Sequence, residues 1–365
     1  MFFVSLPSYD GASTEMYCNS RYFTKIEVGT IVEGLLRSEI MIFDVARHKF
    51  SEGLITLMLF ALVSVFAALS STELVVVEGG AVLRGVIDHF SVNHPVASAL
   101  LMFPMLIYSG LRFARAAVRV GLYSASSLGL LALGGVAMFA ATTSSSYMSL
   151  MVVVWLVSEL LGRLLYCLGA NMRISYLFTA MLALGVMPLV DSALIPIVLA
   201  LPVIVIAMRG TLRETIITLV GVAFPTFVYC YMVWLFGGEF NGVFMTIWRD
   251  GGALVARDAL LSYLALPRLI FLGVTLFLSI CSLISYRGVR VALVDSARTI
   301  WRLLIILLLM LVAMLMLMPL ASPTVVVVLL LVMTLMLPQL FIRVDVVTAT
   351  FVYLIWVVSA LATLI

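Results

Sequence analysis

Two residues of opposite charge lie inside one long apolar segment and are the first candidates for chemistry. Glu159 and Arg163 occur within the run from Leu150 to Leu168, which is otherwise almost entirely apolar. Their spacing puts both side chains on one helix face, with the acid first, the more favourable order for an ion pair. At 1.5 Å per residue, Glu159 lies roughly 13 Å from the expected cytoplasmic end of this helix. Ionisable groups at that depth of a bilayer are costly and usually face a bundle interior.

The pair has two interpretations, and the sequence leaves both open. In the first, Glu159 is a proton-linked or substrate-contacting acid in a central cavity, together with Arg163, Asn171 and Asp191. In the second, Glu159 and Arg163 are a structural ion pair that locks two helices together.

A group of arginines forms the second candidate site. Three of them share one helical face at spacings of three and four residues, and three more occur in later connections: Arg112, Arg115 and Arg119, then Arg173, Arg209 and Arg213. Guanidinium groups match the geometry of phosphate, so these residues suit a lipid headgroup. The enrichment of short cytoplasmic loops in arginine explains the same residues without a ligand.

Other chemistry has little support in the sequence. Glu73, Glu78 and Asp88 fall in one predicted connection, where carboxylates could be catalytic or bind a metal. Their spacing matches no ligand pattern, so we expect solvated loop charges. The histidines and cysteines are far apart and give no metal or disulfide framework. Nucleotide-binding and hydrolase motifs are absent from the sequence. We therefore expect no metal, no cofactor and no binding of nucleic acid.

The composition places these residues in a membrane protein. The chain has 365 residues, of which 64% are hydrophobic and 11% charged, and its mean hydropathy is +1.24. Soluble domains carry about 25% charged residues. The apolar runs have the length of membrane-spanning helices and lack the alternation of a β-barrel. We predict an all-α fold, a polytopic transmembrane helical bundle.

Eleven membrane spans are predicted, and the arginines orient them. The spans cover about 53–70, 95–111, 121–141, 148–168, 174–190, 192–208, 215–236, 266–286, 303–320, 323–342 and 346–365. Arginines follow every second span, whereas the opposite connections are acidic, uncharged or mixed. Since cytoplasmic loops carry the excess of Lys and Arg, we predict a cytoplasmic N-terminus and an external C-terminus.

Two features distinguish the spans from one another. Leu303–Leu320 and Val325–Leu340 are nearly pure Leu, Met and Val, so we expect them to face lipid at the edge of the bundle. Pro188, Pro202 and Pro225 interrupt earlier spans. Broken helices are tolerated only where protein or a watery cavity covers the freed backbone, and in many transporters the substrate binds there.

Residues 1–40 are more polar than the rest and have two interpretations. They form a cytoplasmic tail, or they precede a true translation start at Met41, where a short basic segment leads into the first span. They lack the pattern of a signal peptide. Residues 41–365 are expected to form a single transmembrane domain.

Three short segments carry a family resemblance. An apolar run ends in Pro202, an Arg-x-x-x-Arg-Glu turn spans 209–214, and a Gly-x-x-x-Pro follows at 221–225. Together with the basic start near Met41, this pattern resembles an uncharacterised family of polytopic inner-membrane proteins of Bacteroidota. The resemblance implies a multi-pass protein of the bacterial inner membrane and no particular activity.

Three function classes follow from these observations. The first is a non-catalytic subunit or scaffold of an envelope-assembly system, with a partner membrane protein and membrane lipids as its contacts. The second is a transporter or flippase with a central cavity around Glu159 and Arg163. The third is a membrane-embedded glycosyl or lipid transferase that uses a polyprenyl-linked substrate and an acid in an outer loop.

Overall fold

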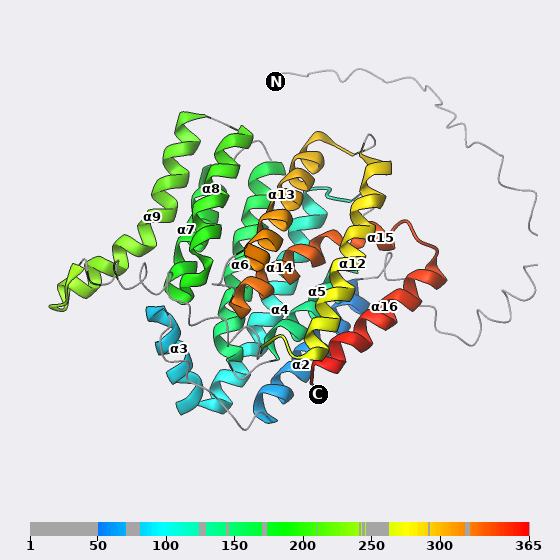
Figure 1. Cartoon of the computed structure of the whole chain (residues 1–365), viewed down its shortest axis with the longest axis horizontal. Coiled ribbons are helices and arrows are strands. Elements are labelled where there is room, and N and C mark those ends of the chain that lie inside the picture. Colours follow the sequence, from blue (N-terminus) through cyan, green and yellow to red (C-terminus); the bar gives the residue numbers. More distant parts are fainter. Residues whose placement is uncertain are drawn as a thin grey trace, which may run out of the picture. The chain divides into compact units, whose positions relative to one another are not determined.

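The described part of the chain is entirely helical (Figure 1). A computed structural model defines residues 50–70, 81–123, 129–143, 146–169, 174–209, 211–240, 242, 245, 263–290, 293–317 and 322–364. Its helices are α2 (Phe50–Ser70), α3 (Val82–Asn93), α4 (Pro95–Arg119), α5 (Gly129–Thr142), α6 (Tyr147–Gly169), α7 (Ile174–Val190), η1 (Ser192–Leu194), α8 (Ile195–Arg209), α9 (Leu212–Leu235), α12 (Leu266–Val289), α13 (Asp295–Leu317), α14 (Pro323–Met336), α15 (Pro338–Phe341), α16 (Val346–Leu361) and η2 (Ala362–Leu364). The predictions for residues 1–40 and for Glu73 and Glu78 lie outside these residues.

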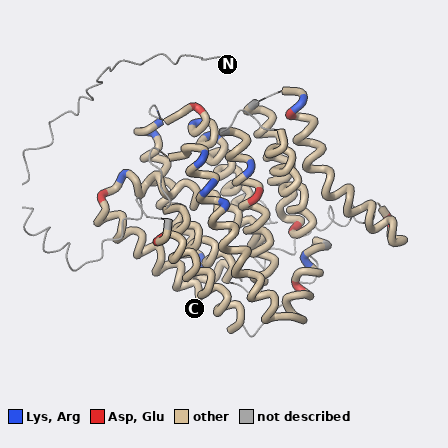
Figure 2. The backbone as a smooth tube through the Cα atoms, turned by 180° about the vertical axis from the view of Figure 1, so that it is seen from behind, with Lys and Arg blue, Asp and Glu red and all other residues tan. Residues whose placement is uncertain are grey.

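Eight helical segments in the described residues are long and apolar enough to cross a membrane. They are α2, α4, α6, α9, α12 and α13, the α14–α15 segment and the α16–η2 segment. Three further apolar helices, α5, α7 and α8, lie at predicted spans but are shorter. These lengths and compositions confirm the prediction of an all-helical membrane protein. Figure 2 shows that charged residues are few along the helices and that several of them lie close together in the middle of the view.

Side-chain contacts group the helix ends into two sets. In the first set, Trp301 Nε1 of α13 donates to the carbonyl of Leu122, 3.3 Å away. Tyr123 donates to the carbonyl of Leu335, and Tyr286 stacks on Trp301 with ring centroids 4.6 Å apart. The end of α4, the α12–α13 connection and the end of α14 therefore meet at one end of the bundle.

The second set contains the ends of α5 and α7 and the starts of α12 and α14. Ser322, at the start of α14, donates to Asp191 at the end of α7 over 2.7 Å. Arg268 of α12 donates to the carbonyl of Thr143 at the end of α5. In Figure 1 the C-terminus and α3 lie at the lower end, opposite the α8–α9 and α12–α13 connections.

Helices α4 and α6 pack parallel to each other. The hydroxyls of Ser98 and Tyr147 lie 2.5 Å apart near their starts, and Arg119 donates to Tyr166 near their ends. In both contacts the residue of α6 follows its partner on α4 by nearly the same number of positions, as expected for parallel neighbouring helices. The chain therefore returns between them, and α5 lies in that return.

Helices α7 and α9 also pack parallel, at unusually close range. A Cβ added to Gly221 would lie 2.7 Å from Met181 Cβ, and one added to Gly185 would lie 2.2 Å from the carbonyl oxygen of Val222. Both distances are below van der Waals contact, so only glycine fits. Small residues let membrane helices approach closely, and α8 returns between these two.

The core of the bundle contains two helices with little polar character. Every residue of α5 and of α14 is buried, and the two helices contact each other. The expectation that Val325–Leu340 faces lipid is therefore wrong. An apolar side chain in a membrane packs about as favourably against lipid as against protein. Composition therefore does not distinguish a central helix from a peripheral one. By contrast, only 17% of the apolar stretch of α9 is buried inside the protein.

Candidate functional site

Glu159 lies inside the bundle, with three partners from two helices. Its side chain is 8% exposed. Arg163 Nε, one turn later on α6, donates to Glu159 Oε2 over 2.5 Å. Tyr108 of α4 donates to Glu159 Oε1, and Arg112 Nε of α4 lies 3.6 Å from that oxygen. We refer to Tyr108, Arg112, Glu159 and Arg163 as the Glu159 cluster.

A glycine on α6 makes room for the second arginine. A Cβ added to Gly162 would lie 3.2 Å from Arg112 Cγ and 3.3 Å from Arg112 Nε. These distances are tighter than ordinary contacts, so a larger residue would push the guanidinium away. Gly162 thus lets Arg112 reach across from α4 to the carboxylate of Glu159.

The charges of the Glu159 cluster do not cancel. Two guanidinium groups face one carboxylate, so the cluster carries a formal charge of about +1 when all three groups are ionised. Arg112 and Arg163 keep 27% and 31% of their side chains exposed. They therefore retain donors that another anion can meet.

A cavity of about 670 Å³ opens beside the cluster. Its polar lining includes Tyr108, Glu159 and Arg163, and the rest is mostly apolar. The apolar wall comes from α6, α7 and α9, with residues such as Trp155, Leu182, Val186, Phe224 and Met232. The volume falls within the roughly 300–1,000 Å³ of small-molecule sites, which combine an apolar lining with a few polar groups.

The remaining arginines are not gathered into the same site. Arg119 donates to Tyr166 and its guanidinium lies 5.6 Å from the centre of that ring. Tyr166 in turn stacks on Tyr176 of α7 at 5.4 Å. Arg115 and Arg213 are exposed. Asn171, Arg173 and the side chain of Arg209 lie outside what the structure describes.

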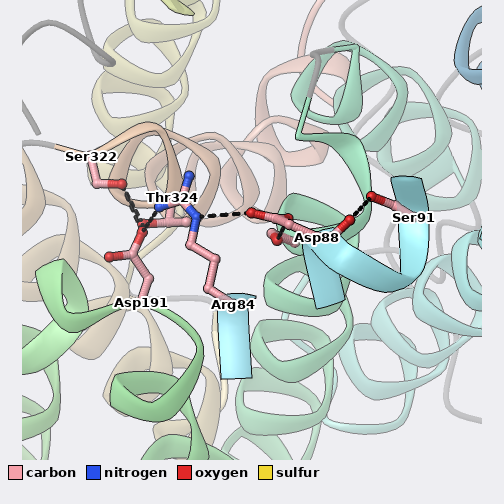
Figure 3. Close-up of polar contacts among 7 residues, drawn as sticks. Arg84, Asp88, Ser91, Asp191, Ser322 and Thr324 are labelled. Carbon is pink, nitrogen blue, oxygen red and sulfur yellow. Dashed lines mark hydrogen bonds and ion pairs between the residues drawn. The ribbon is translucent and has the colours of Figure 1, made fainter. Parts of the chain in front are cut away.

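Asp191 belongs to a different cluster from Glu159 and does not line its cavity. Figure 3 shows the side chain of Asp191 facing Arg84 of α3, with Ser322 and Thr324 also close to its carboxylate. Arg84 Nη1 lies 3.5 Å from Asp191 Oδ2, and Arg84 Nε lies 3.6 Å from Asp88 Oδ2. Ser149 of α6 donates to Asp88. We refer to Arg84, Asp88, Ser149, Asp191, Ser322 and Thr324 as the Arg84 cluster.

Asp88 is not a solvated loop charge, which corrects the expectation from sequence. It lies on α3 and is 2% exposed, and Arg84 is 9% exposed. Burial raises the pKa of the Asp88 carboxyl, and its contacts with Ser149 and Arg84 offset only part of that rise. Arg84 was not predicted as a site residue, although its spacing of four from Asp88 is that of a helical ion pair.

The segments that carry the family resemblance have structural roles. Thr211 and Glu214 form a capping box at the start of α9, with both reciprocal contacts at 3.4 Å. Gly221 fits against Met181, and Pro225 lies 3.0 Å from the position of a Cβ on Gly185. The capping box and the Gly-x-x-x-Pro pattern therefore position α9 against α7.

Comparisons with known proteins give no identification. No family model, curated protein or solved structure matches the chain. Within the described residues, no group of three or more His, Cys, Asp or Glu side chains is placed to hold a metal ion. The arrangement of the Glu159 cluster is suited to binding, with cationic donors at one end of an apolar cavity.

Proposed function

We propose that this chain is a multi-pass membrane protein of the transporter or flippase class that binds an anionic lipid beside Glu159. The observation that carries the proposal is the cavity of about 670 Å³ whose polar part contains Glu159 and Arg163. An apolar wall with a cationic end matches a ligand that has a hydrocarbon part and an anionic headgroup.

The charge of the cluster supports an anion. Arg163 lines the cavity, and Arg112 stands beside it on the carboxylate of Glu159. An arriving phosphate or carboxylate would bring the formal charge of the cluster from about +1 towards zero, and guanidinium groups bind phosphate with directed hydrogen bonds. Glu159 holds the arginines in place while the site is empty.

The wall of the cavity supports a lipid. Phe224, Val228 and Met232 line the cavity from α9, and each of these side chains is also at least 40% exposed on the protein surface. The cavity and the outside of α9 are thus continuous through the same residues. A lipid could enter between helices without passing through water.

Polar groups continue from the cavity along α4 and α6. Beyond Glu159 and Arg163, the next polar contact between these helices is that of Arg119 with Tyr166, close to the end of α4. This series gives a headgroup successive partners between mid-membrane and the arginine-rich end. It favours movement of the lipid over a purely static binding site.

The finer topology is part of the proposal. We propose eleven crossings, with the N-terminus inside, the C-terminus outside and the protein in a bacterial inner membrane. The two sets of helix ends support this count, as do the parallel pairs α4–α6 and α7–α9. Each pair needs one returning segment, and α5 and α8 occupy those positions although they are short.

The two other function classes receive less support. A transferase would need an accessible acid in the first outer connection. Of the three acids there, Asp88 is buried against Arg84 and Ser149, and Glu73 and Glu78 lie outside the residues that the structure describes. The subunit hypothesis stays a prediction, because the exposed apolar face of α9 suits lipid and a partner protein equally.

Reconstitution into vesicles tests the proposed function. We expect the wild-type protein to speed the exchange of a fluorescent anionic phospholipid between leaflets, and Arg163→Gln to slow it at least about tenfold, as loss of a charged hydrogen bond would. Arg298→Gln is the matched control, since Arg298 pairs with the exposed Asp295 at 3.3 Å. Equal rates for wild type, Arg163→Gln and protein-free vesicles would contradict the proposal.

A further inference from the structure

The Arg84 cluster holds more negative than positive charge in a buried place. Arg84, Asp88 and Asp191 are 9%, 2% and 5% exposed. Within the described residues, the charged groups facing Asp88 are Arg84 on its own helix and Asp191 at the end of α7; α6 and α14 contribute hydroxyls. With all three groups ionised the cluster would carry about −1, and an uncompensated buried charge is costly enough that the group takes up a proton instead.

The carboxylates of Asp88 and Asp191 differ in how many hydrogen bonds they accept. Asp191 Oδ2 accepts from Ser322 at 2.7 Å, from Thr324 at 2.8 Å and from Arg84 at 3.5 Å. Asp191 Oδ1 accepts from the backbone N–H of Ala193 at 2.9 Å. Both oxygens of Asp191 therefore have hydrogen-bond donors.

Asp88 has a poorer set of donors. Ser149 donates to its Oδ1, whereas its Oδ2 is buried and has no hydrogen-bond donor. The Nε of Arg84 lies 3.6 Å from that oxygen and is likewise without a hydrogen-bond partner. The unsatisfied oxygen and the surplus negative charge therefore coincide on one residue.

We propose that Asp88 is a proton-binding site. The carboxylate takes one proton from the aqueous phase to become a carboxylic acid, and the cluster is then neutral, with Arg84 paired to an ionised Asp191. Loss of the proton returns the negative charge to Asp88, which then competes with Asp191 for Arg84.

The Arg84 cluster is connected to the proposed lipid cavity by residues that are close to it in the sequence. Leu83, next to Arg84 on α3, and Leu189, two residues before Asp191 on α7, both line that cavity. The contact between Arg84 and Asp191 ties these two segments together. Arg84 and Asp191 are thus close in sequence to residues that form the cavity wall. The proton site itself does not depend on the lipid proposal.

The pH dependence of stability tests the proton site. The pKa of Asp88 lies above its ordinary value of 3.8, so the folded state holds a proton that the unfolded state releases. This contribution to stability is complete below pH 3.8 and is lost as the pH rises through the folded-state pKa. Each pH unit in that window should lower the folding equilibrium constant by up to about tenfold.

The experiment measures thermal unfolding of the full chain in detergent, in potassium buffers over the widest pH range in which the protein stays soluble, beginning at about pH 4. We expect the melting temperature of the wild type to fall with rising pH, and that of Asp88→Asn to lose this dependence. Asp295→Asn is the matched control, since Asp295 pairs with Arg298 but its side chain is 93% exposed. It should keep the wild-type profile.

Three results would overturn the proposal. A wild-type profile unchanged by Asp88→Asn would mean that another group titrates, and a profile that depends on sodium at constant pH would indicate a metal cation in place of the proton. Infrared spectra of the wild type give a second reading if Asp88→Asn fails to fold. A buried protonated carboxyl band that disappears as the pH rises is expected, and its absence at every pH would refute the proton site.

Discussion

Arg112 Nε of α4 lies 3.6 Å from Glu159 Oε1 of α6, in the space that Gly162 leaves open. This contact makes the ion pair within α6 part of a connection between two helices. It also leaves the cluster with more positive than negative charge. The structural and the ligand-binding interpretations of Glu159 are therefore compatible, because the same carboxylate ties α4 to α6 and positions two arginines.

Removing Glu159 should destabilise the protein. Glu159→Ala leaves Arg112 and Arg163 without their counter-charge. We expect a loss of about 2 kcal/mol, below the roughly 3–5 kcal/mol of a fully buried pair, because both arginines are about a third exposed. Replacing both Glu159 and Arg163 by Leu leaves only one unpaired arginine and should cost less. Thermal unfolding in detergent checks the order, and equal losses would show a role for Glu159 beyond its partners.

Gly162→Ala should separate lipid binding from stability. The added Cβ would meet Arg112 at 3.2–3.3 Å and displace its guanidinium. We expect weaker retention of anionic lipid but little loss of stability, since Ala in a helix gains about 0.5–1 kcal/mol over Gly.

Gly134→Ala is the control for that prediction. Gly134 lies in the buried helix α5 and a Cβ there meets nothing within 4 Å. It should gain helix stability and leave lipid retention at the wild-type level. Unchanged lipid retention in Gly162→Ala would argue against Arg112 as part of the binding site.

Gly185→Ala should disrupt the packing of α7 on α9. The new Cβ would lie 2.2 Å from the backbone oxygen of Val222, which can move only with its helix. Overpacking of this kind costs about 1–3 kcal/mol, so we expect a lower melting temperature. Gly273→Ala of α12 should not lower the melting temperature, because its Cβ would meet nothing within 4 Å. The close helix contact would be disproved if the two variants melted together.

Reporter fusions should reveal the proposed topology. Alkaline phosphatase fused after residue 365 should be active and the same enzyme fused after Arg209 inactive, since the first is expected outside and the second inside. Green fluorescent protein at the same positions should give the reciprocal pattern. Activity at both positions would exclude the span count of eleven.

The sequence predicted the helices well because their signal is local. Apolar runs of the right length and punctuating arginines are visible without knowledge of neighbours, and each predicted span has a helix in the structure. The position of a helix in the bundle is not local. Val325–Val328 would look the same against lipid as in the core, where α14 lies.

In the candidate sites too, contacts within one helix could be predicted and contacts between helices could not. Glu159 and Arg163 share one helix face, so their pairing could be predicted, and the contribution of Tyr108 and Arg112 could not. Asp191 pairs with a residue 107 positions earlier. Nothing in the local sequence of Asp191 indicates Arg84 as its partner, because the contact depends on how α3 folds back on α7.

Native mass spectrometry of lipid affinity tests the central claim most directly. Wild type, Arg163→Gln and Arg298→Gln would be titrated in mild detergent with an anionic phospholipid and with a zwitterionic one of the same acyl chains. We predict that the wild type and Arg298→Gln prefer the anionic lipid and that Arg163→Gln loses this preference. Equal preference in all three proteins would contradict a headgroup site at the Glu159 cluster.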